Sequence, residues 1–486
     1  NISATVPFSA AELFSRKVRD TYCGDSLRYI AFPLGGIGSG CISMSGTGKL
    51  IDWEIQNRPD KGFQPRYSFF GLWAREEGGE PAFKVLEGQL VERLDGPMYL
   101  TEDMWYGGNG LGPQQTQAAG LPRFRHCRFS SRFPFAQVDL QDEHMPVSAT
   151  VEAWSPFIPG DSRHSSLPVA VFNITLTNTS SKPVDISLGV NVQNLAGRYN
   201  RVLREKSFTV LELSDGRDGG RSMFVASPAM ATTWQTNWIG DNIWTALEHY
   251  ARSFIRSGRF AMAATAVREE GEEYAGPPAK SGSGRRSSIN NDRVGSLGFQ
   301  YALAPGAAIT IPVVLGWYFP VFDTADPKEL ARGYREWRNY YGQQWASGLE
   351  VARYTVTHLQ ALQERTRLFQ KRFFASTLPG VVLESIASQL AVLRSPTLIR
   401  YPDGTLYGWE GCAIAKRLGP GTANHVYNFQ HVLPYLFPDL QRSMLENFYC
   451  NGFRESDGAI QYRLPLGPNA RAQDQPAQEV YGKKTN

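Results

Sequence analysis

Hydrophobic and polar residues alternate in short runs along most of the chain between residues 65 and 320. The run 184–192 alternates without a break, which is typical of an antiparallel strand with one buried face. The segment before it repeats the pattern at Phe172, Ile174 and Leu176. Residues 178–183 predict the turn between these two strands, and 307–315 predict another strand. Repeated strands separated by Gly- and Pro-containing turns predict a large two-sheet β-sandwich.

The spacing of the apolar residues changes to that of helices near residue 325. Asp326-Pro327 is a typical helix start. Ser347 and Glu350 form a capping box for a longer helix. Apolar residues follow the two starts at helical spacing: Leu330, Tyr334, Trp337 and Tyr341, then Val351, Tyr354, Leu359, Leu362 and Phe369. The change of period predicts a β-sandwich domain over 1–324 and a helical domain over 325–486.

Other helices are predicted over 10–19, 381–393, 425–436 and 438–449. Residues 268–297 are charged and rich in Gly and Ser, and they predict a long exposed loop within the sandwich.

A string of glycines at 35–40 invites comparison with a dinucleotide-binding loop. That fingerprint requires G-x-G-x-x-G leading into a helix. The spacing here is different, and the following residues have a strand and turn pattern. The string is therefore interpreted as tight backbone packed under neighbouring strands.

Composition limits the possible functions. The 486 residues (54.1 kDa) allow two or three domains with substantial cores. Hydrophobic residues make up 42% of the chain, which excludes a wholly disordered protein. The net charge of +4 is spread without a dense basic stripe, so no nucleic-acid partner is expected.

The five cysteines are irregularly spaced and lack a C-x-x-C pair, so neither a disulfide framework nor a zinc site is predicted. The histidines form no H-E-x-x-H motif, so no metal is expected. No run of 18 apolar residues predicts a transmembrane helix. The expected location is the cytoplasm of a bacterium, and the alternative is a periplasmic or secreted protein whose signal peptide has been removed.

The residues with the clearest chemical meaning lie at 403–425. Glu410 stands between Trp409 and Gly411, in a segment whose glycines predict an irregular loop rather than a helix or strand. Tyr407 and Trp409 offer flat apolar faces of the kind that cover a sugar ring. A carboxylate on a loop at the mouth of a helix is a common catalytic arrangement. The alternative is that Glu410 caps a helix or forms a surface ion pair.

Residues 407–412, 421–428 and 436–444 resemble the start of the catalytic domain of glycoside hydrolase family 116. Residues 30–40 and 52–59 resemble the opening of that family's N-terminal domain. The family contains bacterial β-glucosidases and non-lysosomal glucosylceramidases. The resemblance implies an antiparallel β-sandwich followed by an (α/α)6 solenoid. The helical part is long enough for only about half of such a solenoid, so a C-terminally truncated catalytic domain is expected.

The resemblance also implies a function: retaining hydrolysis of a β-glycosidic bond in a carbohydrate or glycoconjugate, with no cofactor. It makes Glu410 the nucleophile and implies substrate contacts from Trp409, Tyr407, Thr422, Asn424 and His425. The glucosidases of the family have an Asp where Asn424 stands, which puts glucose specificity in question. His425 is equally compatible with capping the next helix.

No residue of the chain matches the family's acid/base carboxylate, so 1–486 alone is expected to be inactive. Asp457 is the nearest turn carboxylate, but Asp457-Gly458 is more simply explained by a β-hairpin. The competing hypothesis is a non-catalytic carbohydrate-binding sandwich with a remnant helical domain. A concave, aromatic-lined pocket around Glu410 would favour the enzyme, and an exposed or ion-paired Glu410 would favour the binding protein.

Overall fold

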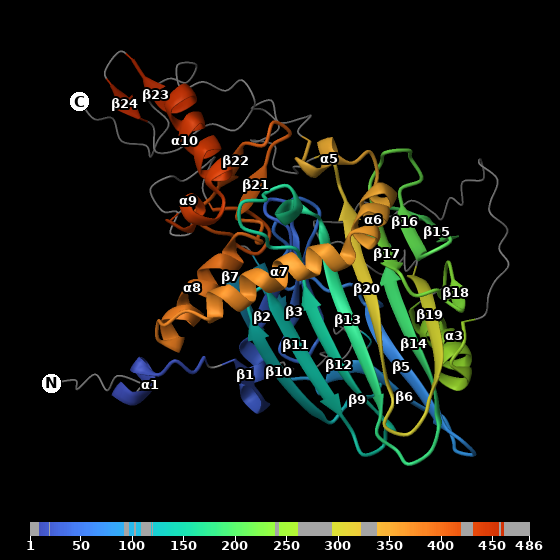
Figure 1. The fold of residues 1–486 in the computed structure, drawn as a ribbon. Coiled ribbons are helices and arrows are strands. Elements are labelled where there is room, and N and C mark those ends of the chain that lie inside the picture. Colours follow the sequence, from blue (N-terminus) through green and yellow to red (C-terminus); the bar gives the residue numbers. More distant parts are fainter. Residues whose placement is uncertain are drawn as a thin grey trace.

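Two large sheets packed face to face make up most of the molecule, and helices from the C-terminal part cover one side and one end of them (Figure 1). The structure is a computed structural model that describes residues 9–18, 20–91, 97–101, 104–107, 118, 120–238, 243–260, 294–321, 338–418, 431–455 and 458–460. Strands dominate before residue 321 and helices after 338, which confirms the predicted sandwich followed by a helical part. The (α/α)6 solenoid stays a prediction.

The larger sheet has nine antiparallel strands. Their order across the sheet is β1 (Thr21–Tyr22), β10 (His126–Arg132), β11 (Phe135–Gln141), β12 (Val147–Trp154), β13 (Val169–Asn178), β20 (Ala308–Tyr318), β17 (Ser222–Ser227), β16 (Thr209–Ser214) and β15 (Tyr199–Arg204). Strands β13 and β20 confirm two of the strand predictions. Strand β20 continues three residues beyond the predicted end at 315.

The smaller sheet has six strands, which are antiparallel except that β9 runs parallel to β6. Their order is β18 (Thr233–Gln235), β19 (Val294–Leu303), β14 (Val184–Gln193), β5 (Phe69–Glu76), β6 (Ala82–Gly88) and β9 (Arg123–Phe124). Strand β14 confirms the strand predicted over 184–192. Residues 268–293 of the predicted loop lie outside the described residues. Its last four residues, 294–297, belong to β19.

The main core lies between the two sheets. Phe172 and Ile174 of β13 and Ile186 and Leu188 of β14 are fully or almost fully buried in one cluster. Phe70 meets Phe172 edge to face, with 5.1 Å between the ring centroids, and so joins the sheets directly. Since alternate residues of a strand point to opposite faces, these positions are the apolar half of the alternation seen in the sequence.

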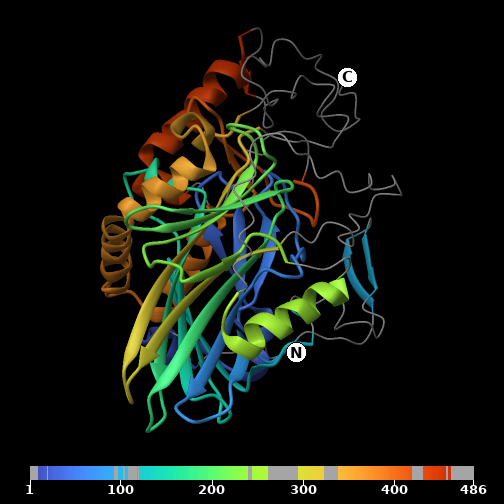
Figure 2. The same cartoon turned by 90° about the vertical axis from the view of Figure 1, so that its right-hand side faces the viewer.

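From residue 186 onward, strand β14 is buried on both faces, which corrects the prediction of a strand that is half-buried along its length. Ser187 and Asn191, on its polar side, are at most 1% exposed. They lie beneath α3 (Ile243–Tyr250) and the π-helical turn η3 (Ala251–Ile255), which cover the outer face of the six-stranded sheet (Figure 2). Asn191 remains hydrogen-bonded there: its Nδ2 donates to the Tyr250 hydroxyl at 3.3 Å, and its Oδ1 accepts from Ser296 at 2.7 Å.

The described helices of the C-terminal part are α5 (Tyr341–Gln344), α6 (Gly348–Thr357), α7 (Leu359–Phe374), α8 (Gly380–Val392), α9 (Leu433–Leu436) and α10 (Pro438–Gly452). Helices α8 and α10 confirm the predictions over 381–393 and 438–449. The helix predicted to begin at Asp326 lies outside the described residues. So does the start of the one predicted over 425–436, whose described α-helical part begins only at Leu433. The short N-terminal helix α1 (Ala10–Phe14) ends before the predicted residue 19.

The capping box at the start of α6 is present. The Ser347 hydroxyl accepts a hydrogen bond from the Glu350 N–H at 3.3 Å. The Glu350 carboxylate accepts one from the Ala346 N–H at 2.7 Å, one residue before the cap. The first bond satisfies an amide that a helix start leaves without an intrahelical partner, and the second ties the preceding residue to the helix.

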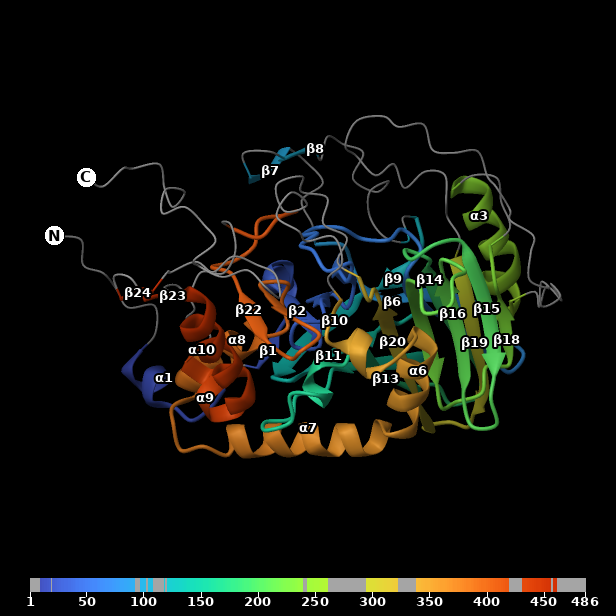
Figure 3. The ribbon, with the colours of Figure 1, turned by 90° about the horizontal axis from the view of Figure 1, so that it is seen from above.

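Helices α6 and α7 pack on the outer face of the nine-stranded sheet. Val351, Leu359 and Leu362 share a buried cluster with Val171 of β13 and Val314 of β20. Figures 1 and 3 show α7 lying across the strands on this side, opposite α3. The apolar face predicted from the sequence is therefore the face that covers the sheet.

A third sheet connects the sandwich to the helical part. It contains β2 (Ala31–Gly35), β3 (Cys41–Ser45) and β4 (Leu50–Glu54), and the glycine string forms the turn between β2 and β3. A Cβ on Gly38, whose φ is +71°, would lie 2.7 Å from Cβ and 2.8 Å from N of Arg400. The glycines thus allow close backbone packing, as predicted.

Three two-stranded hairpins lie outside these sheets: β7 (Pro97–Thr101) with β8 (Met104–Gly107), β21 (Leu398–Arg400) with β22 (Leu406–Gly408), and β23 (Phe453–Arg454) with β24 (Ala459–Ile460). The last of these is the hairpin predicted from Asp457-Gly458. Asp457 itself lies outside the described residues.

Candidate functional site

The hairpin β21–β22 carries Glu410 two residues beyond its second strand. Ile399 pairs with Tyr407, and Leu398 pairs with Gly408. The connecting turn contains Gly404 with φ +95°, a conformation that glycine adopts without a steric penalty. The segment was predicted to be irregular, but its residues 406–408 form a short strand. The reason is that 398–400 supplies a partner strand, which the glycine content does not reveal.

The two faces of this hairpin pack differently. Leu398 and Leu406 join the main core cluster, together with residues of α8, α9 and α10. The opposite face forms a separate buried cluster of four residues: Ile399, Tyr401, Tyr407 and Trp409. The rings of Tyr401 and Tyr407 meet edge to face at 4.3 Å. The aromatic residues around Glu410 are therefore part of a packed structure.

Residues 409–418 form a compact loop. The Trp409 N–H donates to the Thr397 carbonyl at 3.0 Å, and the Leu418 N–H donates to the Gly411 carbonyl at 3.0 Å. The Arg417 guanidinium lies over the Trp409 ring, 4.7 Å from its centroid. Glu410 lies at the base of this loop with an exposed side chain.

Of the residues predicted to contact substrate, two are buried and three lie outside the described residues. Trp409 is 1% exposed and Tyr407 is 5% exposed, so neither presents a broad free face of the kind expected for sugar stacking. Thr422, Asn424 and His425 lie outside the described residues.

A hollow of about 680 Å³ opens between the β21–β22 turn and helix α10. Its lining includes Tyr401, Tyr407, Asp403, Asp439, Glu446 and Asn447. Tyr407 thus borders it, but Glu410 and Trp409 are not among its lining residues. The described residues do not form the expected cleft with Glu410 between Tyr407 and Trp409.

Arg400 is one of the residues that line this hollow, and several contacts hold its side chain in place. Its Nε donates to the Gly404 carbonyl at 3.1 Å, and its Nη1 donates to the Ser162 carbonyl at 3.0 Å. The guanidinium also lies 3.6 Å from the centroid of the Tyr340 ring. Burial lowers the pKa of Arg400, and the neighbouring Tyr340 and the Asp439 carboxylate counteract part of that effect. With these bonds, Arg400 acts as a structural link between the hairpin and the sandwich.

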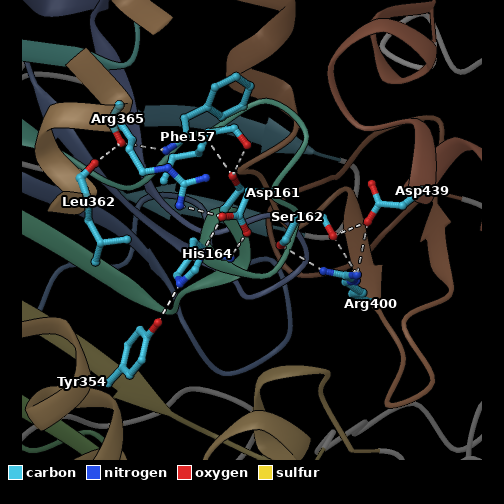
Figure 4. A network of polar contacts seen from close by, with 12 residues as sticks. Phe157, Asp161, Ser162, His164, Tyr354, Leu362, Arg365, Arg400 and Asp439 are labelled. Carbon is cyan, nitrogen blue, oxygen red and sulfur yellow. Dashed lines mark hydrogen bonds and ion pairs between the residues drawn. The ribbon is translucent and has the colours of Figure 1, made fainter. Parts of the chain in front are cut away.

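No pattern in the sequence points to Arg400 or Asp439, because their roles depend on contacts with residues 162–166. The same polar region continues away from the hollow (Figure 4). Asp161 Oδ2 lies 2.6 Å from His164 Nδ1 and 2.8 Å from Arg365 of α7. His164 Nε2 lies 2.6 Å from the Tyr354 hydroxyl of α6. The network ties one loop of the sandwich to both helices.

We expect Asp161→Asn to lower the free energy of unfolding by about 1–3 kcal/mol at pH 7, because the charged acceptor of two side chains is lost. Burial alone would raise the pKa of Asp161, but the hydrogen bonds from His164 and Arg365 outweigh it and lower the pKa. The stabilisation is therefore complete above the unfolded-state pKa of about 3.9 and is lost as the pH falls through the lower folded-state pKa.

Thermal unfolding of wild type and variant between pH 7 and pH 3 measures this difference. The gap between the two should stay constant down to about pH 4 and then narrow. Asp185→Asn is a suitable control, since Asp185 forms an exposed pair with Arg75 at 3.2 Å and should contribute under about 1 kcal/mol. A gap that persists unchanged in acid would contradict the assignment.

Within the described ranges, no three His, Cys, Asp or Glu side chains come together in a group able to hold a metal ion. Among the helices that the structure describes, none combines the length and apolar character needed to cross a bilayer.

A family model described as "beta-glucosidase 2, glycosyl-hydrolase family 116 N-term" matches residues 31–362. Among solved structures, the chain is similar to a protein assigned as a kojibiose phosphorylase from the human microbiome (9% identity, TM-score 0.37, 86% of this chain and 46% of that one). It is also similar to an α-galactosidase from Lactobacillus brevis (9% identity, TM-score 0.21, 59% of this chain and 39% of that one). The chain thus spans less than half the length of either of these two proteins.

Proposed function

Because the chain belongs to glycoside hydrolase family 116, we propose that it is part of a retaining β-glycosidase of the β-glucosidase type. The match over residues 31–362 is the observation that carries this proposal. The expected substrates are carbohydrates or glycoconjugates with a β-linked sugar, including glycolipids of the glucosylceramide type.

Glu410 is proposed as the nucleophile. In retaining hydrolysis, a carboxylate attacks the anomeric carbon, and the leaving oxygen takes a proton from a second carboxyl group. Water then hydrolyses the glycosyl-enzyme ester with net retention of configuration. The exposed side chain of Glu410, at the base of a hydrogen-bonded loop, is compatible with attack on a substrate that approaches from solvent. We assign the acid/base role to no residue of this chain.

The hollow beside the hairpin that precedes Glu410 supports carbohydrate binding. Two tyrosine rings, carboxylates and amides line it, and such groups can contact both the apolar face and the hydroxyls of a sugar. It is proposed as a place for part of the substrate other than the sugar that reacts with Glu410.

A panel of aryl β-glycosides tests the function in the full-length protein. We expect hydrolysis of at least one β-glycoside, with the β-anomer as the first product seen by NMR. Release of the α-anomer would rule out the retaining mechanism, and the absence of turnover on the whole panel would contradict the enzyme proposal.

One observation favours a second function, a non-catalytic carbohydrate-binding protein. Glu410 is exposed, and the hollow lined by Tyr401 and Tyr407 does not include it. Under this alternative, sugars would bind in the hollow and remain intact. Calorimetric titration with oligosaccharides distinguishes the two: binding that is lost in Tyr407→Ala, without hydrolysis in any variant, would support the alternative.

Asn424 is proposed to weaken the preference for glucose, because an amide replaces the carboxylate that glucosidases of the family have at this position. Restoring the charge in Asn424→Asp should raise kcat/KM for glucosides relative to other glycosides by roughly 10-fold, the effect of about 1.4 kcal/mol of transition-state binding. Specificity constants on the same aryl glycoside panel measure this ratio. An unchanged ratio would exclude a role for this side chain in sugar selection.

A further inference from the structure

The loop that carries Glu410 is held by the sandwich as well as by its own hairpin. The Lys61 N–H donates to the Ile414 carbonyl at 2.9 Å. Arg417 Nη2 donates to the Asn57 carbonyl at 2.8 Å. Both partners belong to the segment that follows β4, so the loop rests on residues far away in the sequence.

Arg417 joins three parts of the molecule. Its Nη2 reaches Asn57 of the sandwich, and its Nε donates to the Pro396 carbonyl at 2.8 Å, just before β21. Its guanidinium carbon also lies over the ring of Trp409, the residue next to Glu410. A guanidinium has several donors in a fixed plane, so one side chain can make all three contacts at once.

Side-chain hydrogen bonds also hold the supporting segment in place. Asn57 has φ +62°, and its Nδ2 donates to the Phe319 carbonyl at 2.9 Å, beside the end of β20. The Glu54 carboxylate is buried and accepts bonds from Lys61 Nζ at 2.7 Å and from the Asp60 N–H at 3.2 Å. Because a buried carboxylate is costly unless it is paired, these bonds strongly favour one conformation of residues 54–61.

We propose that Arg417 is a positioning residue for Glu410, which transmits the fixed position of residues 54–61 to the loop 409–418 through Asn57, Pro396 and the Trp409 ring. This inference rests on the proposed function for the role of Glu410, but the contacts themselves do not. It makes the N-terminal sandwich a part of the catalytic apparatus rather than an attached module.

The test is Arg417→Lys in the full-length protein. Lysine keeps the charge but cannot make two divergent bonds and a planar stack. We expect kcat on an aryl β-glycoside to fall roughly 10–100-fold, the effect of a displacement of about 1 Å at a reacting group, with KM near the wild-type value. We also expect the amides of 409–418 to exchange with deuterium about tenfold faster or more, while those of β13 and α7 are unchanged.

Arg367→Lys is the matched control. Arg367 also stacks on an aromatic ring, that of Phe135 at 3.6 Å, and its Nη2 donates to both oxygens of Glu152 at 2.7 Å, but it lies on α7. The control should lower stability without changing kcat or the exchange of 409–418. If Arg417→Lys does not fold, Arg417→Gln is measured in the same way.

The outcomes separate the two proposals. Wild-type kcat and wild-type exchange of 409–418 in a folded Arg417 variant would overturn the inference. The inference would also be overturned if Arg417→Lys and Arg367→Lys each lost kcat in the same proportion to their loss of stability. If the wild type hydrolyses no glycoside, or Glu410→Gln stays active, the proposed function fails, and the exchange measurement alone then decides whether Arg417 holds the loop.

Discussion

Glu410→Gln should reduce β-glycoside hydrolysis by the full-length protein roughly 10⁴–10⁶-fold, the size of loss expected when a covalent nucleophile is removed. The carboxamide has nearly the same shape but is neutral, so it cannot form the glycosyl-enzyme ester. The measurement is kcat/KM on an activated aryl glycoside. A fluorosugar that traps glycosyl-enzymes should label a peptide containing Glu410 in the wild type and leave the variant unlabelled.

Two further variants show whether the effect belongs to Glu410. Glu364→Gln changes an exposed glutamate of α7 that accepts a bond from Gln360, and it should retain full activity. Glu446→Gln changes a carboxylate that lines the hollow. Loss of labelling in Glu446→Gln together with full activity in Glu410→Gln would move the nucleophile into the hollow and end the assignment to Glu410.

Gly38→Ala should lower the free energy of unfolding by roughly 2–5 kcal/mol, about 1–2 for a left-handed non-glycine residue and about 1–3 for overpacking. The added methyl group would lie 2.7 Å from Cβ and 2.8 Å from N of Arg400, so the turn between β2 and β3 would have to separate from β21. Because β21 belongs to the hairpin that precedes Glu410, activity at temperatures below unfolding should fall as well. Thermal unfolding and kcat measure the two effects.

Gly62→Ala isolates the steric part of that loss. Gly62 has a similar φ of +77°, but a Cβ there would meet no atom within 4 Å. Its expected cost is therefore only the conformational part, about 1–2 kcal/mol. Equal destabilisation by the two substitutions would mean that the turn between β2 and β3 can move away from β21 without a steric cost. The contact between that turn and β21 would then contribute nothing to stability.

The strands and helices that form the core could be predicted because the spacing of their apolar residues is visible within each segment of the sequence. The alternation at 184–192 gives β14, and the capping box at Ser347 and Glu350 gives the start of α6. The burial of Ser187 and Asn191 could not be predicted in this way. It depends on Tyr250 and Phe254, which cover the strand from a distant part of the sequence.

The candidate site could be predicted only in part, for the same reason. Glu410, Trp409 and Tyr407 attract notice in the sequence because a carboxylate stands among aromatic residues and glycines. Their surroundings follow from pairing with 398–400 and from support by Asn57 and Lys61. No local pattern contains those contacts, and so the sequence suggests a stacking surface where the structure has a packed cluster.

Helices α6 and α7 have a further consequence through the cluster that they share with the nine-stranded sheet. Leu359 and Leu362 bury Val171 and Val314, and those strand residues in turn bury the helices. Neither side can melt without exposing the apolar face of the other. The sandwich and these two helices therefore form one cooperative unit, so a substitution in α7 has its thermodynamic effect on the strands beneath it as well.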